Sequence, residues 1–311
     1  MKQYDIIGDI HGHALELIAL LKKLGYAQHN GCYKHSDRVA IFTGDFIDGG
    51  LHNEEVINIV RPMVDSGAAY AVMGNHEYNA ICYHTLHPKT GVPLREHSTK
   101  NTKQHRAFLN EFDGKPKQLE EIISWFKELP LFLDLGHLRI VHAEWNQNEI
   151  DSVKIQLSDK NEVSDDFIIR SAQIGSKENG AVECLLKGSE ATLPDGISFK
   201  DKYGHERYEG RLCWWEKSRK TESLFMVPDD VKNRLSELSI NSENFISYDA
   251  TMPPVFFGHY WLSGCPSVQS ENAVCVDYSV AKEGGKLCCY AFNNNERVSA
   301  DNFCFVNRFE S

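Results

Sequence analysis

The sequence predicts an α/β fold built on a parallel sheet whose strands end in polar, glycine-containing turns. Short apolar runs at residues 4–7, 39–43 and 68–73 each lead into a turn that carries Asp, Asn or His. Between the runs, apolar residues recur at helical spacing, for example at positions 15, 18 and 21. The resulting order of elements, strand, helix, strand, helix, strand, is typical of a parallel sheet. In such a sheet the turns that follow the strands lie at one edge.

The first strand, residues 4–7, turns at GDIHG, where two glycines allow a sharp bend, and an amphipathic helix follows. The second strand, residues 39–43, ends in GDFIDGG, and the third, residues 68–73, ends in GNHE. The helix between them carries apolar side chains at 56, 59, 60 and 63 on one face. Residues 78–118 are polar and are predicted to form loops and short helices, with their four scattered histidines on the surface.

The second half of the chain is predicted to contain further strands around an irregular segment. A helix near residues 119–126 precedes a hairpin of residues 131–135 and 138–141. Residues 146–210 have poor periodicity, so a loop-rich insertion is expected there, with a substrate-binding lid as its candidate role. Regular strands return at 255–257, 273–276, 287–292 and 303–306. No linker composition divides the chain, so residues 1–311 are expected to form a single domain.

The composition excludes several classes of partner. A formal net charge of −11 over 311 residues argues against binding a nucleic acid polymer. No segment approaches the roughly 18 consecutive apolar residues of a membrane helix, so no membrane partner is expected. The chain enters a strand at once, without room for a signal peptide, which favours a cytoplasmic location. Nine cysteines without metal-site spacing are expected to be reduced thiols with structural roles.

Residue types that bind metals follow five of the predicted strands. They are Asp9 and His11, Asp45 and Asp48, Asn75 and His76, His142, and His259. Carboxylate, amide and imidazole groups suit divalent cations. One carboxylate can bridge two cations about 3.5–4 Å apart, which activate a bridging water for in-line attack at phosphorus. The alternative is that each of these residues only forms an ordinary buried hydrogen bond. That explanation would have to apply at all five strand ends independently, so a two-metal centre is the favoured interpretation.

The motifs GDIHG, GDFIDGG, GNHE, VHAE and FGHYW, in that order, resemble the signature of the calcineurin-like metallophosphatases. The chain is most similar to the branch of phosphoprotein phosphatases and bacterial diadenosine tetraphosphatases, because Trp261 stands where many metallophosphoesterases have a further histidine. The likeness is specific over residues 4–80, shorter at 138–145 and 254–262, and absent from 146–210. It implies two packed mixed β-sheets flanked by helices.

The resemblance also implies a role for each polar residue of the motifs. The implied metal ligands are Asp9 and His11 for the first ion, Asp45 as the bridge, and Asn75, His142 and His259 for the second ion. His76 matches the acid that protonates the leaving oxygen, and Asp48 matches the carboxylate that orients it. The expected cofactor is a pair of divalent ions, with manganese as the first choice and iron or zinc as alternatives.

The chain departs from the family pattern in its phosphate-binding cation. Gly49 stands where the family has an arginine that grips a phosphate oxygen. Arg211 or Arg219 is expected to supply a cation instead, with Arg211 favoured. Tyr278 is a second candidate for contact with substrate, with core packing as the alternative. Glu144 stands where relatives often have glycine, and it is either a second carboxylate beside the metals or a solvated loop residue.

Three functional hypotheses follow. The first is a dinuclear phosphatase that acts on phosphomonoesters, such as phosphoserine, phosphothreonine or phosphotyrosine in a protein, by attack of a metal-bridging water. The second is a symmetrical diadenosine tetraphosphatase, for which Trp214, Trp215 and Trp261 are candidates to stack on adenine. The third is a non-catalytic metal-binding module. A phosphorylated protein or a small phosphoester is therefore the expected partner.

Overall fold

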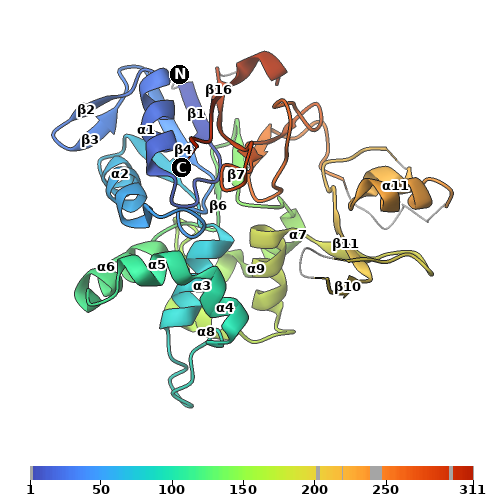
Figure 1. Cartoon of the computed structure of the whole chain (residues 1–311), viewed down its shortest axis with the longest axis horizontal. Coiled ribbons are helices and arrows are strands. Elements are labelled where there is room, and N and C mark those ends of the chain that lie inside the picture. The colour runs from blue at the N-terminus through green and yellow to red at the C-terminus, as the bar shows by residue number, and fades with distance from the viewer. Residues whose placement is uncertain (1–2, 201–203, 219, 239–246, 294–296, 311) are drawn as a thin grey trace.

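Two mixed sheets packed face to face form the centre of the molecule, with helices around them (Figure 1). The structure is a computed structural model that describes residues 3–200, 204–218, 220–238, 247–293 and 297–310. Arg219, the less favoured cation of the sequence analysis, lies outside the described residues.

The first sheet has the strand order β15, β16, β1, β4, β5, with β17 beside β16. The bounds of its strands are β1 Gln3–Ile7, β4 Arg38–Phe42, β5 Ala69–Ala71, β15 Asp277–Tyr278, β16 Lys286–Phe292 and β17 Phe303–Asn307. Strands β1, β4 and β5 run parallel, whereas β16 runs antiparallel to β1, so the sheet is mixed.

The second sheet has the order β14, β13, β7, β6. Its strands are β6 Phe132–Asp134, β7 Arg139–Val141, β13 Val255–Phe257 and β14 Ala273–Cys275. Strand β13 is parallel to both β7 and β14, and the hairpin partner β6 is antiparallel to β7.

Alternation along the strands divides the apolar side chains between two cores. Tyr4 and Ile6 of β1 face the second sheet, where they share a buried cluster with Ile140 and Phe256. Ile7, next along β1, belongs to a larger cluster that the helices complete. Each fully buried side chain of this kind contributes about 1.5–3 kcal/mol to stability. The predicted fold of two packed mixed sheets flanked by helices is confirmed.

The helices that precede the second sheet are α1 Ala14–Lys23, α2 Asn53–Asp65, α3 Asn75–His84, α4 Thr99–Gln104, α5 Arg106–Glu111 and α6 Pro116–Lys127. The helices predicted after the first two strands and near residues 119–126 are present, whereas α3 begins within the GNHE motif that was predicted to be a turn. Helix α1 buries Leu17, Leu20 and Leu21, and it has Glu16 in its first turn and lysines in its last, which complements the helix dipole. In the described part of the chain, every helix falls short of what crossing a bilayer requires in length and apolar content.

The segment 146–210 is not loop-rich, which corrects the expectation from its composition. It contains α7 Gln147–Val153, α8 Asp165–Ser171 and α9 Lys177–Lys187, and a short 3-10 turn, Lys154–Gln156. The polar residues that suggested loops are helix caps: Asn146, Ser164 and Ser176 each accept a hydrogen bond from the backbone N–H three residues on. Short helices with narrow apolar faces have little periodicity for a sequence to display.

A smaller layer lies beyond these helices, on the right of Figure 1. It comprises β8 Glu190–Thr192, β9 Phe199–Lys200, β10 Glu206–Arg207, β11 Glu209–Leu212, α10 Thr221–Leu224, β12 Phe225–Met226 and α11 Asp229–Leu235. Strand β11 pairs with β8 and β12, and the layer has its own apolar cluster around Phe225 and Val231. This layer presents Arg211 to the main body from β11.

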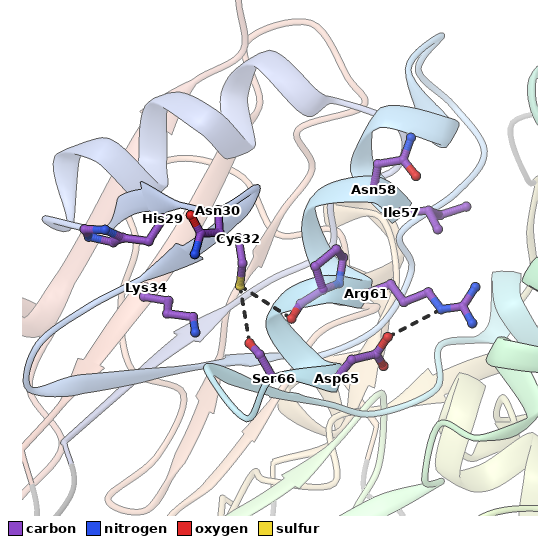
Figure 2. Close-up of a pocket in the computed structure, with 10 residues that line it drawn as sticks. His29, Asn30, Cys32, Lys34, Ile57, Asn58, Arg61, Asp65 and Ser66 are labelled. Atoms are coloured by element: carbon purple, nitrogen blue, oxygen red, sulfur yellow. Dashed lines mark hydrogen bonds and ion pairs between the residues drawn. The ribbon is translucent and has the colours of Figure 1, made fainter.

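The hairpin β2 Ala27–His29 and β3 Cys32–Lys34 packs beside α2 and leaves a hollow of about 630 Å³ between them (Figure 2). There Cys32 Sγ lies 3.3 Å from Ser66 Oγ, and Arg61 and Asp65 form an ion pair of 3.7 Å. None of the predicted site residues lines this hollow. It is therefore separate from the site described next.

Candidate dinuclear metal centre

The turns that follow five strands meet at one edge of the two packed sheets. The backbone N–H of His259, after β13, donates to Asp9 Oδ2, after β1, at 2.9 Å. Asp45 Oδ2, after β4, lies 3.4 Å from His142 Nε2, after β7. Asn75, after β5, has its Oδ1 3.1 Å from the same nitrogen. Residues far apart in the sequence are thus brought into one buried cluster.

Asp45 lies at the middle of this cluster. Its Oδ1 accepts a hydrogen bond from the N–H of His76 at 2.9 Å, and its own N–H donates to Glu77 Oε2 at 2.8 Å. Its Oδ2 lies 3.6 Å from His11 Nε2 and 3.4 Å from His142 Nε2, and it has no hydrogen-bond partner among the described residues. Burial opposes the charge of this carboxylate, but the positive potential of His142 and His76 holds its pKa well below the usual range.

Two imidazoles are oriented by backbone carbonyl groups behind them. His142 Nδ1 lies 2.7 Å from the carbonyl oxygen of Thr43, and His11 Nδ1 lies 3.2 Å from that of Ile47. When each Nδ1–H donates to its carbonyl, the Nε2 atoms turn toward Asp45. The carbonyl contacts are the ones that fix the ring of a metal-binding histidine. Burial also lowers the pKa of His11 to about 4, which keeps its ring neutral and able to bind a cation.

His259 has the most unusual environment of the group. Both of its ring nitrogens are buried and neither has a hydrogen-bond partner among the described residues. Burial, with the nearby charge of Arg211, holds its pKa well below the usual range, so the ring is neutral. An unpaired polar atom in the interior costs about 1–3 kcal/mol. A cation bound to one nitrogen removes that cost.

These unpaired atoms fit a pair of divalent ions. Two groups of side chains could each hold one ion, because within each group the ligand atoms lie within 4.8 Å of one another. The first group is His11, Asp45 and His76, and the second is Asp45, His142 and His259. Asp45 therefore belongs to both. A shared carboxylate is the arrangement that a bridging ligand requires. Asp9 is in neither group: its oxygens accept from His259 N–H at 2.9 Å and from Thr43 Oγ1 at 3.4 Å.

The backbone around the cluster adopts left-handed conformations that cost energy. His11, Asp45, Asp48, His259 and Trp261 all have φ between +49° and +69° without being glycine. Such conformations cost about 1–3 kcal/mol each and persist where the surrounding structure enforces them. Their concentration here supports a functional site.

Glu77, the last residue of GNHE, holds one of these turns. Its carboxylate is completely buried and accepts hydrogen bonds from the N–H groups of Asp45, Phe46 and Gly74 at 2.8–3.0 Å. The sequence analysis gave this residue no role. Its three backbone contacts show that it supports the turn that presents Asp45.

Asp48 orients two histidines rather than one. Its Oδ2 lies 2.6 Å from His76 Nδ1, as the sequence analysis led us to expect, and its Oδ1 lies 3.0 Å from His105 Nδ1. Burial opposes the charge of Asp48, but hydrogen bonds from His105 and His76 lower its pKa to about 2. For His76, burial is outweighed by the charges and hydrogen bond of Asp45 and Asp48, which raise its pKa to about 9.

His105 was expected on the surface, but it is buried. Its Nε2 lies 3.3 Å from His84 Nε2, and its ring stacks on Phe108 with centroids 4.7 Å apart. Helices α4 and α5, on either side of it, bring it against Asp48. A single histidine in a polar segment does not belong to any periodic pattern of apolar residues, so nothing in the sequence indicated that His105 is buried.

Removing the side chain of His105 is expected to slow turnover without releasing metal. In His105→Ala, Asp48 loses one of its two histidine donors, and we expect kcat to fall about 5- to 20-fold, below the loss of a whole acid–base group. His105→Asn retains a donor near the Nδ1 position and should recover most of the rate. His29→Ala, on the remote hairpin, is the control. Equal loss in the alanine and asparagine variants, or loss of metal, would contradict this positioning role.

The structure places Arg211 on the His259 side of the cluster. Its guanidinium lies 5.9 Å from the centroid of the Tyr260 ring, and one Nη is 3.6 Å from Glu190. Its Nε is buried without a hydrogen-bond partner among the described residues. Its charge also lowers the pKa of His259, which agrees with a position on this side of the cluster.

Two other residues of the sequence analysis have structural roles. Glu144 is buried, and it accepts hydrogen bonds from Ser189 N–H at 2.7 Å and from Asn146 Nδ2 at 3.2 Å, so it is not a solvated loop residue. Tyr278 is also buried, and its hydroxyl accepts from Ser267 N–H at 2.8 Å and donates to the Ser267 carbonyl at 3.2 Å. The alternative of core packing therefore describes Tyr278, rather than contact with substrate.

Comparison with known proteins is consistent with this geometry. A family model described as calcineurin-like phosphoesterase matches residues 3–180. The asymmetrical bis(5'-nucleosyl)-tetraphosphatase PrpE of Halalkalibacterium halodurans is 38% identical over 157 residues, which are 48% of this chain and 60% of that protein. PrpE of Bacillus subtilis is 33% identical over 160 residues, 50% of this chain and 63% of that one.

A protein serine/threonine phosphatase from Saccharomyces cerevisiae, with similarity to human phosphatase PP5, has a similar structure. Its TM-score is 0.53 at 14% identity, over 100% of this chain and 81% of the yeast chain. At this identity the likeness shows the fold alone. The chain spans about 60% of the length of the curated relatives described above.

Proposed function

The chain belongs to the calcineurin-like phosphoesterase family, and from this we propose that it is a metal-dependent hydrolase of phosphoric esters and anhydrides. The observation that carries the proposal is the position of Asp45, whose Oδ2 lies between two imidazole nitrogens and has no hydrogen-bond partner among the described residues. A bound cation would give a partner to the two atoms that have none among the described residues, Asp45 Oδ2 and His11 Nε2.

We propose that six residues hold two divalent ions. They are Asp9 and His11, Asp45 as the bridge, and Asn75, His142 and His259. When bound, two such ions activate a water molecule and neutralise the charge that develops on the phosphoryl group. Manganese, iron and zinc all accept this ligand set.

The residues of the chain supply the proton for the leaving group. The 2.6 Å contact between His76 Nδ1 and Asp48 fixes the ring so that its Nε2–H is available to the leaving oxygen. The side chain of His76 is 21% exposed, which leaves it accessible to substrate from the adjacent cavity. We propose that Arg211, which lies on the His259 side of the cluster, contacts a phosphate oxygen. Asp48 orients the acid.

Dinucleoside tetraphosphates are the substrates that we propose first. Both relatives named above are called asymmetrical bis(5'-nucleosyl)-tetraphosphatases. The sequence analysis expected symmetrical cleavage for a substrate of this type, so the position of cleavage is a separate question for the assay. Phosphoproteins, the first choice of the sequence analysis, have support only from the shared fold of the yeast phosphatase.

Hydrolysis in the presence of manganese tests the proposal; it is followed as phosphate release for the monoesters and as nucleotide products for the dinucleotide. The panel contains diadenosine tetraphosphate, p-nitrophenyl phosphate, and phosphothreonine and phosphotyrosine peptides, with chromatography of the nucleotide products. We expect the dinucleotide to be the best substrate by kcat/KM and to yield ATP and AMP. Two molecules of ADP would show symmetrical cleavage instead.

Each remaining outcome rejects part of the proposal. A phosphopeptide with the highest kcat/KM would make the protein a phosphoprotein phosphatase. Two bound metals without turnover of any substrate would make it a binding module. The matched control is His76→Ala under the same conditions, which separates hydrolysis by this site from hydrolysis by free manganese or a contaminant.

A further inference from the structure

A cavity of about 600 Å³ opens directly beside the candidate centre. One of its walls is formed by the site itself, through His11, Asp48 and His76. Helix α4 contributes Lys100 and Lys103 to the lining, and Trp261 and Ala281 line the cavity as well. A volume of this size is within the 300–1,000 Å³ of typical small-molecule sites, which is room for more than a single phosphoryl group.

The wall nearest the centre has no lysine or arginine. Gly49 has no side chain there, and its φ of +94° disfavours any residue that has one. A Cβ at this position would lie 3.3 Å from the Cβ of His11 and 3.4 Å from that of Ala281. A lysine or arginine that meets an anion in the cavity must therefore come from another part of the lining.

Helix α4 provides that charge. Lys100 and Lys103 are three residues apart, so they lie on the same face of the helix, and both line the cavity. Neither forms an ion pair with any residue in the described ranges. Their positive charges stand out in a chain whose net charge is −11. Lysine ammonium groups bind phosphate oxygens as point charges.

Trp261 provides an aromatic surface on the same cavity. Its backbone has φ +53° and is held there by the N–H, which donates to buried Asp277 at 2.6 Å. Lys282 Nζ lies 4.4 Å from the centroid of its ring. An indole that is held in a costly backbone conformation at the rim of a polar cavity is suited to a planar ligand, because nucleobases stack on aromatic side chains.

We propose that this cavity is a subsite for a nucleotide, in which Lys100 and Lys103 bind the phosphates beyond the one under attack and Trp261 packs against the base. This proposal rests on the proposed function, because it assigns the part of the dinucleotide beyond the reacting phosphate to a cavity next to the same metal centre. It also answers where a cation replaces the arginine that is absent at Gly49. The cations come from α4, which lines the same cavity, in addition to Arg211.

The test compares the hydrolysis of two substrates by the same metal centre. The lysine variant is Lys100→Ala with Lys103→Ala, and its matched control is Lys89→Ala with Lys117→Ala, two exposed lysines outside the cavity. For each, kcat/KM is measured on diadenosine tetraphosphate and on p-nitrophenyl phosphate. We expect the ratio of the two values to fall at least tenfold in the lysine variant, mainly through KM, and to stay within twofold in the control.

The aromatic part is tested with Trp261→Leu and Trp261→Phe. The leucine variant should lower the same ratio at least fivefold, and the phenylalanine variant should restore most of it. Inhibition of p-nitrophenyl phosphate hydrolysis by inorganic tripolyphosphate and by adenosine then separates the two contacts. The lysine variant should weaken inhibition by tripolyphosphate, and Trp261→Leu should weaken inhibition by adenosine.

The two proposals fail in different ways. A ratio within twofold of wild type in both variants would overturn the subsite while leaving a dinucleotide hydrolase. Wild-type protein that hydrolyses p-nitrophenyl phosphate but not the dinucleotide would overturn the proposed substrate. In that case, inhibition by tripolyphosphate that depends on the two lysines would retain the anion site, and inhibition independent of them would overturn it as well.

Discussion

Replacing Asp45 with asparagine is expected to abolish hydrolysis and to remove metal from both positions. The carboxylate belongs to both groups of ligand atoms, so its neutralisation weakens two ions rather than one. The amide is nearly isosteric and can still accept from His76 N–H, which preserves the turn. We expect kcat/KM to fall by about 10³ or more, beyond the loss from a single electrostatic contact.

Elemental analysis and thermal unfolding distinguish this effect from misfolding. In the wild type, manganese should raise the melting temperature, because a ligand that binds only the folded state stabilises it. Asp45→Asn should lose this response and retain its unfolding transition without metal. Asp65→Asn, at the exposed end of α2, is the matched control. Two metals per chain in Asp45→Asn would reject the bridging role.

Replacing His76 with alanine is expected to reduce turnover while both metals remain. Loss of a general acid costs about 10²- to 10⁴-fold. The loss should depend on the leaving group: it should be largest for an alkyl phosphate and smaller for p-nitrophenyl phosphate, whose leaving oxygen is a weak base. An equal loss for both substrates would argue against proton donation.

Metal content decides between two roles of His76. This side chain also lies with His11 and Asp45 in one of the groups of candidate ligand atoms. If His76→Ala loses one metal per chain, the residue is a ligand. If the metals remain and the rate falls with the leaving-group dependence described above, it is the acid.

The sequence was most informative about strands and the turns that follow them. Apolar runs of four to six residues, each ended by glycine and a metal-type residue, predicted β1, β4 and β5 and the site at their carboxyl ends. It was least informative where polar residues cap short helices. The serines and asparagine that cap α7, α8 and α9 have the same composition as a loop, so the segment 146–210 was predicted to be irregular.

The sequence by itself determined the parallel strands and the order of the candidate ligands, through the period of apolar residues and short motifs, and the resemblance carried by those motifs implied the family and its two-sheet fold. Only the tertiary structure decided which polar residues meet. His105 contacts Asp48 across 57 positions, Glu77 holds the turn of Asp45, and Lys100 and Lys103 line the same cavity as Gly49. Tyr278 is directed into the core instead. Such contacts depend on how helices pack around the sheets, and packing between distant segments leaves no periodic signal in a single sequence.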